Sequence, residues 1–167
     1  MIAREALTSE SQLVKHFGGK EGLLEAIFDD GWERLSAQFP AIDAIPGNRQ
    51  KLNTMLELFL RAFEEDPLLK ELMLLESRRM RKSSPDVMLT RGYHRFLIRI
   101  DAILQDMANK GELKPGLAPT AVRAAIIGMM EGLLREQLFF ERRQSAEPMK
   151  GEMIRKVFSV VFGAFLA

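Results

Sequence analysis

Residues 9–24 of this 167-residue chain read SESQLVKHFGGKEGLL. Ser9 is followed three residues later by Gln12, which is the spacing of a capping box. In such a box the serine hydroxyl and the glutamine side chain each accept a hydrogen bond from the other residue's backbone amide. The pattern therefore predicts a short, capped helix over residues 9–16.

The residues before this helix suggest a partner for it. The apolar residues within 2–6 suit the end of a preceding helix, and residues 7–8 suit a tight turn, which together give the geometry of a helix-turn-helix. By spacing alone, a capped surface helix without DNA contacts fits equally well. If the motif does bind DNA, exposed side chains near it would bond to bases or phosphates. These candidate DNA contacts are Ser9, Ser11, Gln12, Lys15, His16 and Lys20.

Apolar residues recur at three- and four-residue steps along most of the chain, which places them on one face of a helix. No strand-like alternation is sustained, so the fold class is all-α. The prolines and the glycine between residues 40 and 47 predict a loop, Asn48 is expected to be an N-cap, and Gly111 is expected to close the longest helix. The helices expected after residue 19 span about 20–38, 48–66, 67–81, 83–111, 119–143 and 149–167.

The composition limits the compartment and the partners. The 24 basic and 23 acidic side chains nearly cancel, so the chain has no general basic field for nucleic acid. It contains no cysteine, which excludes disulfides and fits a reducing cytoplasm. The longest apolar run, residues 157–167, is shorter than the ~20 residues that a membrane-spanning helix needs. The first residues lack the pattern of a signal peptide, and we expect a cytoplasmic protein with no membrane partner.

The sequence gives little support for catalysis. His16 and His94 are the only histidines, and no spaced set of histidines and carboxylates suggests a metal site. The chain also lacks a nucleophile elbow and a phosphate-binding glycine loop. We therefore expect no catalytic residue, no metal and no cofactor, and do not expect an enzyme.

The N-terminal motif resembles the helix-turn-helix signature of the TetR family of transcriptional regulators. The similar segments are IAREA at 2–6, SES at 9–11, Leu13, and HFGGKEGLL at 16–24. In that family the matching pieces are the end of helix 2, the recognition helix and the start of the connecting helix. The resemblance implies a TetR-like helical bundle with a partial DNA-binding domain at residues 1–24 and a ligand-binding and dimerisation domain at 25–167.

The chain also departs from that pattern. The family usually has glycine at Leu7, valine at Thr8, threonine at Gln12 and a tyrosine that touches the DNA backbone at Val14. A left-handed turn that suits glycine strains leucine. Helix 1 and most of helix 2 are expected to be missing, through a misplaced start, trimming or genuine shortening. A dimeric ligand-binding or interaction module without DNA binding therefore stays open as the alternative.

The C-terminal half resembles the same family more weakly. The loop GELKPG at 111–116 and the helix after it are similar to the entry into helix 8 of TetR-type proteins, where the last two helices pair with their mates across a twofold axis. Small side chains at helical spacing let helices approach closely, and the last helix carries a wide apolar face. A terminal helix buried within a monomer is the alternative. The residues expected at the dimer interface are Ala121, Ala124, Ala125, Gly128, Gly132, Val157, Val161 and Phe165.

The resemblance places a ligand pocket among the middle helices. Methionines and aromatic residues suit a small apolar ligand, although each of these residues alone is more often plain core. The polar candidates for orienting a ligand are Tyr93, His94, Arg99 and Glu131. The basic run at 78–82 is expected to be a solvated helix end. The candidate pocket residues are Phe59, Phe63, Met73, Tyr93, Phe96, Met129 and Met130, with Met80 as a further one.

These observations predict a ligand-responsive transcriptional regulator that acts as a repressor. A homodimer would carry two recognition helices and would bind a near-palindromic operator in double-stranded DNA, with half-sites ~34 Å or a multiple apart.

Overall fold

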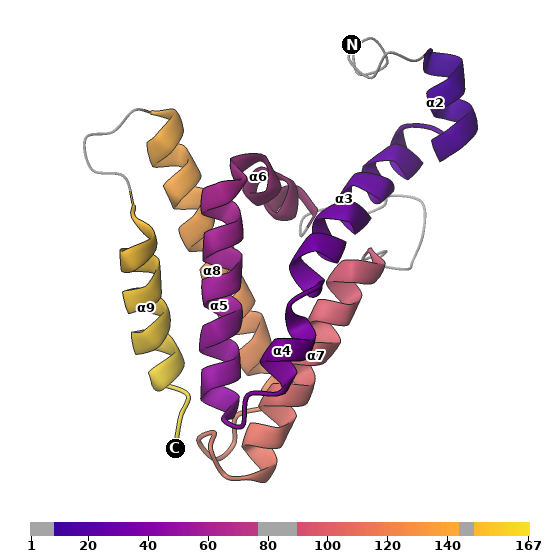
Figure 1. Ribbon diagram of the computed structural model, residues 1–167. Coiled ribbons are helices and arrows are strands. Elements are labelled where there is room, and N and C mark those ends of the chain that lie inside the picture. The colour runs from indigo at the N-terminus through magenta and orange to yellow at the C-terminus, as the bar shows by residue number, and fades with distance from the viewer. Residues whose placement is uncertain (1–8, 77–89, 144–148) are drawn as a thin grey trace.

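The computed structural model describes residues 9–76, 90–143 and 149–167. The regular elements of these residues are all helices, which confirms the all-α class, and they are labelled as in Figure 1. They are α2 (Glu10–Phe17), α3 (Lys20–Ser36), α4 (Phe39–Asp43), α5 (Asn48–Glu65), α6 (Pro67–Glu76), α7 (Arg91–Asn109), α8 (Pro119–Arg142) and α9 (Gly151–Gly163).

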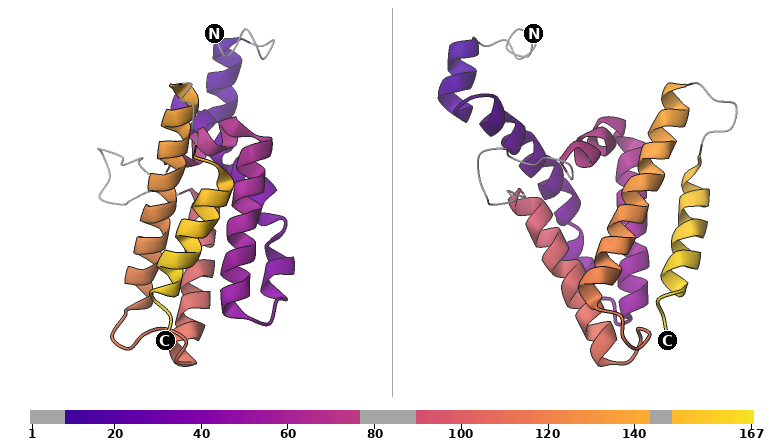
Figure 2. Two further views of the ribbon diagram at one scale, coloured as in Figure 1. Left: turned by 90° about the vertical axis from the view of Figure 1, so that its left-hand side faces the viewer. Right: turned by 180° about the vertical axis from the view of Figure 1, so that it is seen from behind.

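The helices form two arms that meet at one end. α3 and α7 lie side by side in one arm, and α5, α8 and α9 form the other (Figures 1 and 2). α6 lies near the open end and packs against α3, α5 and α8. α2 stands beyond the end of α3, away from the other helices (Figure 1). None of the described helices is both long enough and apolar enough to cross a lipid bilayer.

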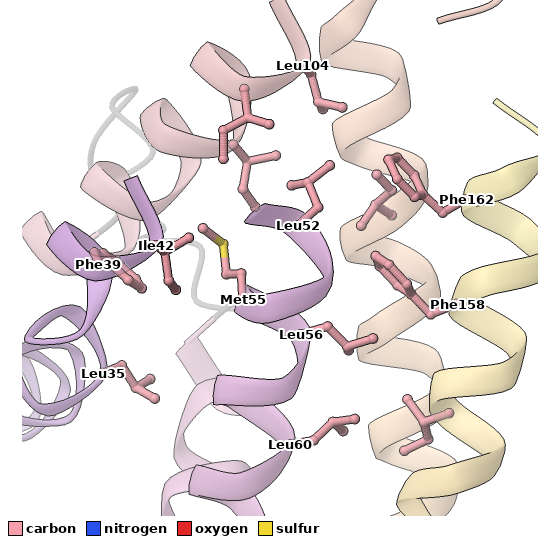
Figure 3. Packing of buried hydrophobic residues seen from close by; sticks show 14 of the residues in the cluster. Leu35, Phe39, Ile42, Leu52, Met55, Leu56, Leu60, Leu104, Phe158 and Phe162 are labelled. Atoms are coloured by element: carbon pink, nitrogen blue, oxygen red, sulfur yellow. The ribbon is translucent and has the colours of Figure 1, made fainter. Parts of the chain in front are cut away.

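The hydrophobic core explains how α9 is held within its arm. α9 contributes Ile154, Phe158 and Phe162, which recur at four-residue steps and are all buried. Figure 3 shows Phe158 and Phe162 pointing from α9 toward the side of α5 that carries Leu56. Burying a side chain of this size stabilises a fold by about 1.5–3 kcal/mol. The inner face of α9 therefore belongs to the core of its own chain.

The segment expected to be a loop after residue 38 contains a helix instead. Pro40 lies in the first turn of α4, where its missing amide proton has no helical partner. Phe39 and Ile42 are buried and hold this short helix on the core. α3 ends before Pro40 as expected, but the loop expected after it was wrong because a proline in a first turn is compatible with a helix.

Asn48 is not the N-cap of α5. Gly47 takes that position, and Asn48 is the first helical residue. The Asn48 side chain is buried, and its Nδ2 donates to Oδ2 of Asp106 on α7 at 2.7 Å. The amide therefore joins two helices instead of capping one.

The ends of α7 are set by two local signals. Thr90 is its N-cap, with a hydroxyl that accepts from the backbone amide of Tyr93, so the helix begins later than the expected start near residue 83. At the other end Gly111 has φ +70°, which confirms its predicted role in closing the helix. The amide of Glu112 donates to the carbonyl of Met107 at 2.8 Å, as in a Schellman motif. The helix end expected at residue 81 lies outside the described residues.

Candidate DNA-binding helix and ligand pocket

The start of α2 is fixed by the predicted capping box. The amide of Gln12 donates to Oγ of Ser9, and the amide of Ser9 donates to Oε1 of Gln12, both at 3.2 Å. Ser11 also places its hydroxyl 2.9 Å from that of Ser9. Three of the six candidate DNA contacts, Ser9, Ser11 and Gln12, therefore make hydrogen bonds that hold the helix start.

The end of α2 depends on glycine. Gly18 and Gly19 have φ of +71° and +117°, which L-residues with a side chain rarely adopt. A Cβ atom on Gly22 would lie 1.7 Å from the carbonyl oxygen of Phe17. The sequence FGGKEG therefore lets α3 begin directly against the last turn of α2, and this close approach sets the direction of α2.

No residue of α2 is buried, so the helix is open to a partner. Lys15 and His16 lie in its last turn, and Lys20 is the first residue of α3. Val14, where the TetR pattern has tyrosine, has 58% of its surface exposed. Leu7 and Thr8 lie outside the described residues. All six candidate DNA contacts, Ser9, Ser11, Gln12, Lys15, His16 and Lys20, are exposed.

A cavity of about 120 Å³ lies among the middle helices. An engineered cavity of similar volume, about 150 Å³, holds benzene, so this one has room for a small ring or a short alkyl chain. Met129 does not line it and instead packs against the core, and Met80 lies outside the described residues. Six of the predicted residues line the cavity, namely Phe59, Phe63, Met73, Tyr93, Phe96 and Met130.

The most informative lining residue is one that the sequence reasoning missed. Trp32 of α3 is the only tryptophan of the chain, and 3% of its surface is exposed. Its ring centroid lies 5.2 Å from that of Phe96, 5.5 Å from that of Tyr93 and 6.0 Å from that of Phe59. These four side chains form an aromatic cluster at the cavity. Helical periodicity placed Trp32 on the buried face of α3, but periodicity cannot tell which buried residue borders a void.

The polar residues expected to orient a ligand differ in whether they line the cavity. Glu131 lines the cavity, and it is the only charged residue among the described residues that do. His94 is exposed and does not line it. Arg99 bonds Oδ2 of Asp43 at 2.8 Å and lies over the ring of Phe39, outside the cavity.

α3 connects the cavity with α2. It is continuous from Lys20 to Trp32, a span of about 18 Å at 1.5 Å per residue, so the domain boundary expected at residues 24 and 25 falls inside one helix. A Cβ atom on Gly31 would lie 2.9 Å from Leu69 and 3.0 Å from Met73 of α6. A movement of α6 or of the Trp32 ring would therefore be transmitted to α3 through direct contact.

The outer face of α8 and α9 is small and apolar. A Cβ atom on Gly128 or Gly132 would meet nothing within 4 Å. Ala121, Ala124, Ala125 and Gly128 are exposed, and Gly132, Val157 and Val161 are half-buried. Phe165 packs against the core of its own chain. Met153, which belongs to the apolar face expected on the last helix, has 51% of its surface exposed. The sequence reasoning missed two exposed apolar residues, Phe139 and Val160, with 45% and 68% of their surfaces exposed.

Histidine, cysteine, aspartate and glutamate form no group of three or more that could hold a metal ion within the described ranges.

Comparison with known proteins finds similarity in fold but no match by sequence. No protein-family profile and no curated protein matches the sequence. A structure described as a TetR family transcription regulator from Shewanella sp. PV-4 has a TM-score of 0.71 and 23% identity, over 99% of this chain and 85% of that chain. The fatty acid degradation regulator FadR from Bacillus halodurans has a TM-score of 0.75 and 17% identity, over 98% of this chain and 86% of that one.

A third structure comes from work on the control of antibiotic production by bacterial hormones. Its TM-score is 0.67 at 23% identity, and the match covers 99% of this chain and 85% of that chain. These likenesses extend over nearly the whole chain, including the helix that carries the sequence signature. The chain therefore has the all-helical fold of the TetR-family regulators.

Proposed function

We propose that this protein is a ligand-responsive transcriptional regulator that binds DNA through α2. The observation that carries the proposal is the link made by α3, which begins at the exposed helix and ends beside an apolar cavity. α2 presents Lys15 and His16 from a capped helix that has no buried residue, which suits insertion into a major groove. The function is binding and control of transcription, without a catalytic step, in the cytoplasm.

Ligand binding would act through Trp32. A small apolar molecule in the cavity would press on the aromatic cluster and shift α3, and with it the direction of α2. In a dimer this movement changes the distance between two recognition helices, which weakens binding to half-sites at a fixed spacing. Repression released by ligand is the mode that we propose.

The dimer would form through the outer face of α8 and α9. Gly128 and Ala124 leave room for a second helix to approach closely. Val160 and Met153 offer exposed apolar area on α9. A second copy of this chain would cover both helices in a four-helix interface.

DNA binding can be tested with fragments from around the gene of this protein. The fragments are titrated at several salt concentrations with the chain and, where the reading frame continues upstream, with the longer product. Saturable binding to one fragment, with affinity that falls as salt rises, supports the proposal. Lys15→Ala should weaken that binding, whereas Lys156→Ala, an exposed lysine of α9, should not.

One observation favours a second function. α2 carries the exposed Val14 at the position where the TetR pattern has a backbone-contacting tyrosine. A dimeric ligand-binding or interaction module without DNA binding would tolerate that change. A chain that dimerises and binds small molecules but selects no fragment, in either length, would establish this alternative.

A further inference from the structure

The charges around the cavity differ from those of a site for fatty acids or other anions. Among the described residues that line it, Glu131 of α8 bears the only charge, and none is lysine, arginine or histidine. The remainder are apolar or aromatic side chains. A carboxylate at this position repels an anionic ligand and attracts a cationic one.

Glu131 is also available for a ligand. It is half-buried, and its carboxylate makes no hydrogen bond or ion pair within the described part of the chain. Two other half-buried carboxylates behave differently. Asp101 pairs with Arg123, and Glu57 pairs with Arg155. The Glu131 carboxylate is therefore free to pair with a bound cation.

The aromatic cluster favours the same charge. The face of an aromatic ring attracts cations, and tryptophan does so most strongly. Trp32, Phe59, Tyr93 and Phe96 supply four rings with centroids between 5.1 and 6.1 Å from their neighbours. Quaternary ammonium groups are recognised by cages of this composition.

We infer that the ligand of this cavity is a small apolar cation, such as an alkyl chain or ring that bears an ammonium group. The inference rests on the proposed function of the cavity as a ligand site. Glu131 would compensate the positive charge, and the aromatic cluster would cover the group. The rest of the molecule would lie along the methionines and leucines that complete the lining.

The single tryptophan gives a direct readout of binding, because Trp32 lines the cavity. Three probes share one six-carbon chain and differ in the charge of the head group: hexyltrimethylammonium chloride, 1-hexanol and sodium hexanoate. Each is titrated against the protein while the tryptophan emission is recorded. The cation should bind at least about 10-fold more tightly than hexanoate, a factor that corresponds to 1.4 kcal/mol.

Two variants test whether the preference for the cation depends on Glu131. Glu131→Gln should weaken binding of the cation about 10-fold and leave 1-hexanol within about twofold, because only the charge is removed. Glu136→Gln removes an exposed carboxylate from the same helix and should change neither. The comparison of probes on the unaltered protein does not depend on either variant folding.

The outcomes separate the ligand class from the existence of the site. If hexanoate or 1-hexanol binds as tightly as the cation, or if Glu131→Gln leaves the preference unchanged, the cation is the wrong ligand class while the ligand site stands. If no probe alters the Trp32 emission, the cavity does not take up molecules of this kind, and both the ligand class and the proposed ligand response fall.

Discussion

The Cβ atom of Trp32 lies 2.2 Å from the position that a Cβ atom on Gly92 would occupy. The backbone of α7 therefore passes against the tryptophan at a point where no side chain fits. Gly92 lies in the first turn of α7, directly before Tyr93 of the aromatic cluster. This contact fixes the position of α3 on α7 and, with it, one wall of the cavity.

Substitution of Gly92 by alanine should lower the free energy of unfolding by about 1–3 kcal/mol, because overpacking forces neighbouring groups to move. Chemical denaturation measures the change. Gly163→Ala is the matched control, since a Cβ atom there meets nothing within 4 Å. Equal stability of the two variants would mean that α3 and α7 do not pack as closely as described.

Lys70 and Glu141 give an asymmetric prediction. The ammonium group of Lys70 is almost wholly buried and bonds the Glu141 carboxylate at 2.9 Å, whereas the side chain of Glu141 is 41% exposed. Glu141→Ala should cost about 1–3 kcal/mol because it leaves a buried charge with Gln137 as its remaining partner among the described residues. Lys70→Met should change stability by less than about 1 kcal/mol, since an apolar side chain of similar length removes the charge altogether. Thermal unfolding of both variants measures which one loses more stability. A larger loss in Lys70→Met than in Glu141→Ala would contradict the prediction.

Asp106 predicts a dependence of stability on acid. Hydrogen bonds from Lys110 and then from Asn48 hold the pKa of Asp106 below its ordinary 3.8. A lowered pKa stabilises the fold at all pH values above the ordinary one, and this contribution is lost as the pH falls through the folded value. The stability gap between the protein and Asp106→Asn should therefore be constant from about pH 5 to about pH 10 and close below pH 3.8.

Lys110, the basic partner of Asp106, affects stability at alkaline pH. The hydrogen bond to Asp106 raises the pKa of Lys110 above 10.5, so its contribution is present below that value and disappears as the pH rises through the folded value. Denaturation midpoints measured from acid to alkaline pH test both ends. A gap that is independent of pH would show that the pair does not form in solution.

The outer face of α8 predicts the oligomeric state. Gly128→Glu places a charge in the stripe of small residues, and a chain that dimerises there should become monomeric, because a buried unpaired charge is costly. Light scattering after gel filtration gives the mass. Ala102→Glu introduces the same charge on an exposed position of α7 and should leave the dimer intact. A monomer before substitution, or a dimer after Gly128→Glu, would place the interface elsewhere or remove it.

The sequence predicts those parts of the fold that depend on local signals. The capping box of Ser9 and Gln12 and the closing role of Gly111 were both confirmed, because each depends on residues close together in the chain. The role of Asn48 as an N-cap was predicted wrongly because its side chain bonds Asp106 instead of the helix end. Asp106 lies 58 residues away, so no local pattern indicates this bond. α4 was missed because Phe39 and Ile42 are held by tertiary packing, which overrides the prolines.

The candidate site was predictable in its members but not in its arrangement. Composition and periodicity named Phe59 and Phe96, yet they could not separate Met130, which lines the cavity, from Met129, which does not. Adjacent residues on a helix differ by about 100° in direction, and the choice between them depends on the exact rotation of α8 against its neighbours. Trp32 was overlooked for the same reason.

We propose that a dimer of this chain places two copies of α2 on one DNA duplex. A hydroxyl-radical footprint on the selected genomic fragment measures this placement. Two protected half-sites are expected, with their centres about 34 Å or a multiple of it apart, and both should be lost in Gly128→Glu. A folded dimer that protects no half-sites on any fragment would overturn the proposal and leave the ligand-binding module as the better description.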